Sequence, residues 1–118
     1  MAENIATEAV LALPVLETIG RIDFSCVPDG HHARPSFTVS VEHRGLGRYA
    51  VVNRGACADA AGVFSYESMP SHRADEWVAE HRFDLATART LAARLAGEVV
   101  SMGRTAADVL RDFPMAEE

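Results

Sequence analysis

Five histidines and two cysteines are the residues of this chain that most readily bind a metal ion. Cys26, His31 and His32 lie close together in the sequence, and Cys57 could join them across a sheet. Their spacing does not match the zinc-finger, HExxH or CxxC patterns. His31 and His32 also follow a predicted turn, where histidine is common. We therefore interpret them as turn residues and predict no metal and no other cofactor.

Ser71, His72 and Asp75 have the residue types of a nucleophile, a base and an orienting acid. They fall within one short polar segment, whereas working triads are assembled from separate elements with backbone donors nearby. No GxSxG, GxGxxG or GxxxxGKS sequence is present. Nothing selects two of the acids as a glycosidase pair. The sequence therefore predicts no catalytic residue, and an enzyme is the less favoured hypothesis.

Arg73, Trp77 and Arg82 belong to the residue types that are enriched at the centres of protein interfaces. They fall in residues 71–82, together with several acids. We predict them as candidate partner-binding residues, on a surface with the polar face of a sheet beside it. The alternative for Trp77, the only tryptophan, is a structural anchor between sheet and helix.

The composition fits one globular domain over residues 1–118, with 48% hydrophobic and 24% charged residues. All 11 basic residues are arginine, against 17 acids, and the net charge of −6 disfavours general binding to a nucleic-acid backbone. No apolar run is long enough to span a membrane, and no secretory signal is recognisable. We expect a soluble, cytoplasmic protein with Cys26 and Cys57 as free thiols.

The longest periodic segment is residues 84–102, which predicts an α-helix of about five turns. Asp84 is placed to cap its first turn, and Gly103 is placed to end it. Thr105 and Asp108 then match a capping box at the start of a short second helix. The apolar face of the long helix is predicted to cover a sheet and consists of Leu85, Ala88, Ala92, Leu95, Val99 and Met102.

Alternating apolar and polar residues predict four strands before the helix, over residues 18–27, 36–43, 48–53 and 63–68. Residues 54–62 are interpreted as a connector of small residues. Residues 77–83 fit two structures. A strand is preferred, because Asp84 would then follow it as a helix cap, and a short helix that places Trp77 and His81 on one face is the alternative.

Strands that precede helices favour the α+β class. We predict an antiparallel meander of four to five strands, with the long C-terminal helix and the short terminal helix packed on one sheet face. Residues 1–16 form an N-terminal segment with a short helix allowed at residues 7–13, and residues 114–118 form a frayed tail. The other face of the sheet is predicted to be partly polar, presenting Thr38, Ser40, Glu42 and Arg48.

The second half of the chain carries a recognisable pattern, which consists of Phe64 to Glu67, Pro70, Ser71, Arg73, Trp77, Arg82, Phe83, the alanine-rich helix and Gly103 to Asp108. On these residues the chain resembles small uncharacterised proteins of actinobacteria and their phages. That group implies no activity, cofactor or catalytic residue. The absence of lysine and the abundance of alanine are typical of such GC-rich genomes.

The order of strands and helix also resembles the double-stranded RNA-binding domain, whose RNA contacts need lysines at the start of the last helix. Here that position holds Asp84, Leu85 and Ala86, which disfavours direct binding to nucleic acid.

These features predict a domain without enzymatic activity that acts through a protein partner, as a self-associating accessory protein or as a phage-type inhibitor of a host protein. One alternative is a small enzyme or ligand binder with a pocket between sheet and helix, and another is an acidic decoy of a nucleic-acid-binding protein. Residues 21–54 carry five arginines and three acids, and residues 59–84 carry two arginines and six acids. These two segments either neutralise each other or form separate patches, one of which meets a charged partner.

Overall fold

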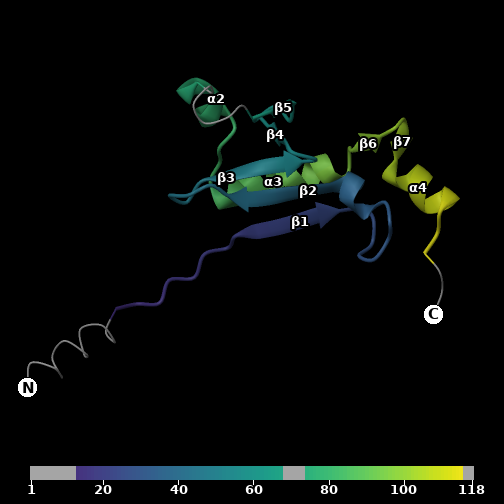
Figure 1. Ribbon diagram of the computed structural model, residues 1–118, viewed down its shortest axis with the longest axis horizontal. Helices are drawn as coiled ribbons and strands as arrows, with labels where there is room; N and C mark the ends of the chain where they lie inside the picture. The colour runs from purple at the N-terminus through teal and green to yellow at the C-terminus, as the bar shows by residue number, and fades with distance from the viewer. Residues whose placement is uncertain (1–12, 68–73, 116–118) are drawn as a thin grey trace, which may run out of the picture.

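The computed structural model describes residues 13–67 and 74–115 (Figure 1). The helix allowed at residues 7–13 therefore falls outside the described residues, apart from Leu13, and so do residues 116–118 of the predicted tail. In chain order the elements are β1 (Arg21–Ser25), the 3-10 helix η1 (Arg34–Phe37), β2 (Thr38–His43), β3 (Tyr49–Asn53), β4 (Ala56–Ala58), β5 (Phe64–Tyr66), α2 (Asp75–Glu80), α3 (Leu85–Ala96), β6 (Val100–Ser101), β7 (Arg104–Thr105) and α4 (Ala106–Asp112).

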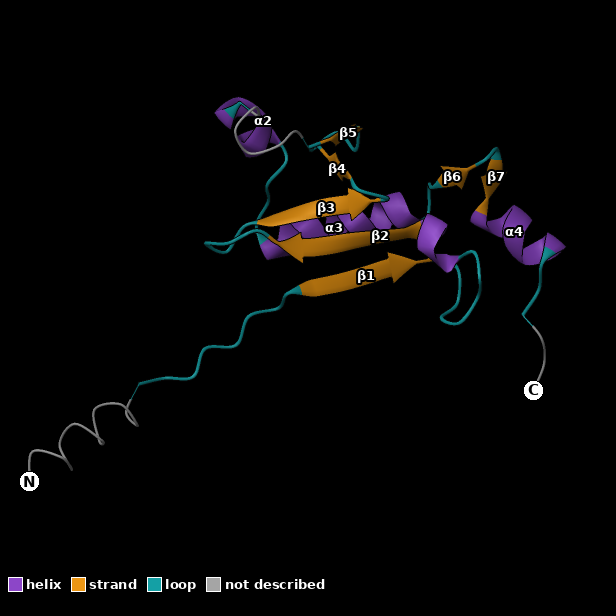
Figure 2. Ribbon diagram, viewed as in Figure 1, coloured by secondary structure: helices purple, strands orange, loops and turns teal. Residues whose placement is uncertain are grey.

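The main sheet is an antiparallel meander in which each strand pairs with the next, in the order β1-β2-β3-β4-β5 (Figure 2). The α+β class and the antiparallel sheet are therefore confirmed. The predicted connector at 54–62 is corrected, because it contains β4. A two-residue turn with positive φ at Arg54 and Gly55 joins β3 to β4. A strand of three small residues carries no alternation signal, which is why the sequence did not indicate it.

The core lies between α3 and one face of β1, β2 and β3. Val41 and Val51 on the strands are buried against Ala92 and Leu95 on the helix. Alanine at every fourth position of α3 lets the helix backbone approach the sheet closely. The apolar face predicted for this helix is therefore confirmed through Leu95.

The predicted length of the helix is wrong, because α3 ends at Ala96 and not at Met102. Gly97 follows as its C-cap, and residues 100–105 form the small hairpin of β6 and β7. Met102 and Gly103 occupy its turn with φ of 52° and 77°. Val99 still packs inward from the segment after the helix, so the apolar periodicity continues past the point where the helix stops.

The preferred strand at residues 77–83 is also wrong, because the alternative helix forms as α2. Only Phe83 makes a strand-like contact, a bridge to Tyr49 with N–O distances of 2.8 and 2.9 Å. Asp84 then caps α3 as predicted, since its carboxylate accepts from the backbone N–H of Thr87 at 2.7 Å. The bridge holds the end of the α2 segment beside β3.

The terminal helix α4 begins with the predicted capping box, in which Thr105 and Asp108 each accept a hydrogen bond from the other's backbone N–H. Its position corrects the prediction, because it lies beyond the end of the sheet (Figure 1) and not on the face covered by α3. There Val109 packs against Val27 and Phe37 in a second, smaller core. Within residues 13–67 and 74–115, no helix has both the length and the apolar character needed to cross a bilayer.

Candidate functional site: the open face of the sheet

The face of β1, β2 and β3 that points away from α3 is partly polar, as the alternation predicted. The strand register places Asp23, Ser40 and Val52 in one row across the three strands. The next row contains Arg21 and Glu42. Neighbouring strands lie about 4.8 Å apart, so side chains within a row are in reach of each other. We call this surface the open face.

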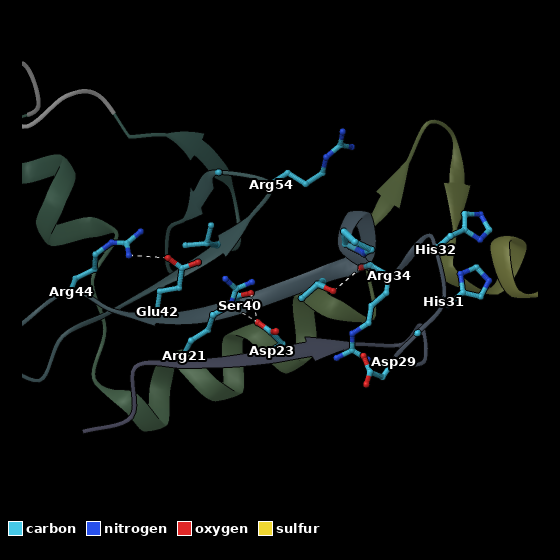
Figure 3. Close-up of a pocket in the computed structure, with 15 residues that line it drawn as sticks. Arg21, Asp23, Asp29, His31, His32, Arg34, Ser40, Glu42, Arg44 and Arg54 are labelled. Carbon is cyan, nitrogen blue, oxygen red and sulfur yellow. Dashed lines mark hydrogen bonds and ion pairs between the residues drawn. The ribbon is translucent and has the colours of Figure 1, made fainter. Parts of the chain in front are cut away.

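A cleft of about 740 Å³ lies over the open face (Figure 3). Its floor is formed by the strands, and its ends by residues 29–35 and by the turn between β3 and β4. Four arginines and three acids line it, which gives the cleft a formal charge of +1 although the whole chain carries −6. The charged lining residues are Arg21, Arg34, Arg44, Arg54, Asp23, Asp29 and Glu42.

Two of these arginines are already paired with carboxylates. Arg21 donates from Nε to Asp23 Oδ1 at 2.8 Å, and Ser40 donates from its hydroxyl to the same oxygen at 2.7 Å. These hydrogen bonds, the one from Arg21 first, lower the pKa of Asp23 below its ordinary value. Arg44 donates from Nη1 to Glu42 at 2.9 Å. The charges on the floor of the cleft therefore largely neutralise each other, through ion pairs between residues two positions apart in the sequence.

Arg34 and Arg54 differ, because neither forms a salt bridge with a carboxylate of the described residues. Arg34, at the start of η1, donates from Nη1 to the carbonyl of Val27 at 3.1 Å. Arg54, in the exposed turn after β3, donates from Nη1 to the hydroxyl of Ser101 at 3.3 Å. Each guanidinium has five N–H donors, so both retain the capacity to bind an anion.

His31 and His32 adjoin one end of the cleft, and both nitrogens of His31 are engaged. The backbone N–H of Ala33 donates to Nδ1 at 3.0 Å, so the proton lies on Nε2, which donates to the carbonyl of Phe113 at 2.6 Å. The exposed His32 ring stacks on His31 with centroids 4.6 Å apart. Within the described residues, no group of three potential ligands is arranged to hold a metal ion. Cys26 is exposed, Cys57 is buried and both are free.

A second polar cluster joins α2 to β5. The rings of Trp77 and His81 stack with centroids 3.9 Å apart. Trp77 Nε1 donates to the Ser65 hydroxyl at 3.3 Å, and His81 Nε2 lies 3.2 Å from the same hydroxyl. His81 Nδ1 lies 2.6 Å from the carbonyl of Trp77, which can only accept, so this nitrogen donates. Trp77 thus anchors α2 to the edge strand of the sheet.

The candidate partner-binding residues from the sequence have different environments. Trp77 is half-buried in the cluster just described, and Arg82 is buried next to Glu67. Arg73 lies outside the described residues, as do Ser71 and His72. Cys57 lies near Glu67, and burial first and then this carboxylate raise the pKa of its thiol. The predicted trio therefore does not form an exposed surface within the described residues.

Sequence reasoning did not single out Arg34 and Arg54 as site residues. Their only signal was the excess of arginine over residues 21–54, which does not indicate which arginines lack a carboxylate partner. That information requires the register of the sheet and the path of the turn. Comparison with known proteins found no family model, no curated protein and no solved structure that matches this chain.

Proposed function

We propose that this chain is a non-enzymatic domain that binds another protein, and that an acidic segment of that protein occupies the cleft on the open face. The observation that carries the proposal is the pair Arg34 and Arg54, which belong to separate elements of one cleft and form no salt bridge with a carboxylate of the described residues. Guanidinium groups bind carboxylates in a planar, bidentate manner, and arginine is enriched at interfaces for this reason.

The shape of the cleft favours an extended segment. The hollow crosses three strands and is open to solvent along the sheet (Figure 3). The expected alternative, a small ligand held between sheet and helix, has less support, because Val41, Ala92 and Leu95 occupy that space. An extended peptide with two or more carboxylates would match the two arginines, since η1 supplies Arg34 at one end of the cleft and the β3–β4 turn supplies Arg54 at another.

The polar groups of the cleft support binding rather than catalysis. The hydroxyl of Ser40 donates to Asp23 and not to an imidazole. His31 has no free ring nitrogen, because Phe113 and Ala33 engage both. A serine–histidine contact exists at Ser65 and His81, but neither residue lines the cleft, and the His81 ring is buried under Trp77.

Site-specific photo-crosslinking in an extract of the source organism tests this proposal. A photoreactive amino acid at Val52, on the floor of the cleft, is expected to form an adduct with a protein. The same group at Thr90, on the exposed side of α3, is the matched control and is expected to give no adduct of that size. Adducts of equal yield from both positions would contradict the proposal.

The role of charge is tested by removing the two arginines. Combined Arg34→Ala and Arg54→Ala should abolish the Val52 adduct, since truncating an interface hot spot costs more than about 1 kcal/mol of binding free energy. Arg54→Ala alone removes only a contact to Ser101 and should leave the fold intact. A weaker adduct in this variant would therefore show that the loss in the double variant is not caused by unfolding through Arg34. Arg89→Ala on α3 removes one positive charge, as Arg54→Ala does, and is the charge control for that single variant. An adduct that persists without both arginines overturns the proposal, and competition by inorganic triphosphate would indicate a phosphate ligand instead.

A further inference from the structure

The outer edge of β1 has hydrogen-bonding groups that no described segment uses. The carbonyl of Gly20 accepts from the N–H of His43 at 2.9 Å, so Gly20 directs its backbone groups toward β2. Backbone direction alternates along a strand, so Arg21, Asp23 and Ser25 direct theirs outward. Within residues 13–67 and 74–115, β1 is an edge strand of the sheet. Such an edge is a template for pairing with another strand.

The segment that leads into β1 carries exposed apolar side chains. Residues 13–20 run away from the sheet as an extended segment (Figure 1). The exposed fraction is 97% for Val15 and 83% for Leu16, while Ile19 is 40% exposed. Because this segment continues the line of β1, a strand that pairs with the edge of β1 would also cover part of this apolar surface. Edge and segment together provide backbone hydrogen bonds and apolar area to the same partner.

We propose that this partner is a second copy of the chain, paired antiparallel along β1 with Ile22 opposite the partner's Ile22. The charges on the strand select this register. It places Arg21 opposite the partner's Asp23, and Asp23 opposite the partner's Arg21, so a two-fold axis generates two ion pairs. The paired residues are those whose backbone groups point outward, as hydrogen-bonded positions require.

Neighbouring registers are less favourable for a two-fold pair. Centring the pair on Asp23 would place two like carboxylates opposite each other, and centring it on Arg21 would do the same with two guanidinium groups. In the proposed register, Arg21 keeps its contact to Asp23 of its own chain, so charges of opposite sign alternate around the axis. Ile19 lies opposite the partner's Ser25, which brings the apolar segment alongside the partner's strand.

This inference does not rest on the proposed function, because it uses the backbone edge of β1. Arg21 and Asp23 also line the cleft, but the test measures self-association and not the binding of another protein. It is tested by sedimentation velocity and equilibrium over a hundredfold range of concentration. The wild-type chain is expected to dimerise. Arg21→Asp and Asp23→Arg should each raise the dissociation constant by about tenfold or more, because each variant places two like-charged pairs opposite each other. Circular dichroism and melting temperature establish that both variants remain folded.

Mixing the two variants provides the decisive measurement. The aspartates at 21 and 23 of one variant would face the arginines at 23 and 21 of the other, so an equimolar mixture is expected to form a heterodimer with the affinity of the wild type. Arg89→Asp, the same charge change on α3, should dimerise normally. A wild-type chain that stays monomeric overturns the proposal. So does a mixture that fails to associate, since it would contradict the register.

Discussion

Arg82 and Glu67 form an ion pair with Nη2 and Oε1 2.7 Å apart, and only 7% of the Arg82 side chain is exposed. The pair links the segment after α2 to the end of β5. Arg82 also donates from Nη1 to the carbonyl of His81 at 3.0 Å. These contacts fasten the α2 segment to the sheet, so we expect Arg82 to act on stability before it acts on any partner.

Replacing Arg82 should therefore destabilise the fold. Arg82→Ala removes a charged hydrogen-bond partner from a mostly buried site, which lowers the free energy of unfolding by about 1–3 kcal/mol. Urea denaturation measures the loss, with the exposed Arg89→Ala as control, for which a change within about 0.5 kcal/mol is expected. If Arg82→Ala left stability unchanged but weakened partner binding, Arg82 would instead be an interface residue, as its residue type suggested.

The pKa of Asp23 predicts a dependence of stability on pH. Hydrogen bonds from Arg21 and Ser40 lower this pKa in the folded state. An unfolded aspartate titrates at about 3.9. The contribution of Asp23 to the free energy of unfolding is thus fully present above about pH 4. It is lost as the pH falls through the lower pKa of the folded state.

The Arg21→Ala variant tests this dependence. It should raise the pKa of Asp23 and so reduce the change in unfolding free energy that Asp23 causes at low pH. Titration of the Asp23 carboxyl carbon by nuclear magnetic resonance separates this residue from Asp84, Asp108 and Asp112, whose pKa values are also lowered by their own hydrogen bonds. An Asp23 pKa that does not change in the variant would show that Arg21 does not contribute to the shift.

The two cysteines should differ in reactivity. Cys26 is exposed, whereas Cys57 is buried on β4 and its pKa is raised, which reduces the thiolate fraction. At pH 8 one thiol per chain should react rapidly with a thiol reagent, and the second should react only after unfolding. Cys26→Ser should abolish the rapid phase and Cys57→Ser should leave it. A native chain in which neither thiol reacts until reductant is added would indicate a disulfide.

Met102 distinguishes the hairpin from the longer helix that periodicity predicts. It has φ of 52° in an exposed turn, a conformation that costs an L-residue about 1–2 kcal/mol. Met102→Gly should therefore raise the melting temperature. In a helix, the same change would destabilise by about 1 kcal/mol. Gly103→Ala is the companion variant and should destabilise, because Gly103 also has positive φ.

Local pattern was sufficient for features that depend on neighbouring residues. Alternation along β2 placed Val39 and Val41 on the core face and Ser40 on the open face, because successive side chains of a strand point to opposite sides. The cap at Asp84 and the capping box at Thr105 and Asp108 were readable because both partners lie within four residues of each other.

Residues 77–83 and 97–102 show where local pattern failed. Trp77 and His81 fit both a strand and a helix by spacing, and α2 is decided by the stacked rings and their contacts to Ser65. Val99 continues the apolar period of α3 although Gly97 ends the helix, because a side chain can point into the core from either backbone conformation. Periodicity reports the direction of a side chain and not the hydrogen bonds that its backbone makes.

The sequence by itself determined that residues 21–54 carry an excess of arginine and that one sheet face is polar. Only the tertiary structure decided which arginines of the cleft form no salt bridge with a carboxylate of the described residues. Arg21 pairs with an acid two residues away on β1, and Arg44, just after β2, pairs with an acid two residues back on that strand. Arg34 and Arg54 are instead brought to one cleft by η1 and by the β3–β4 turn. Composition counts charges, but pairing depends on distances between segments, and these are set by the register and packing of the whole sheet.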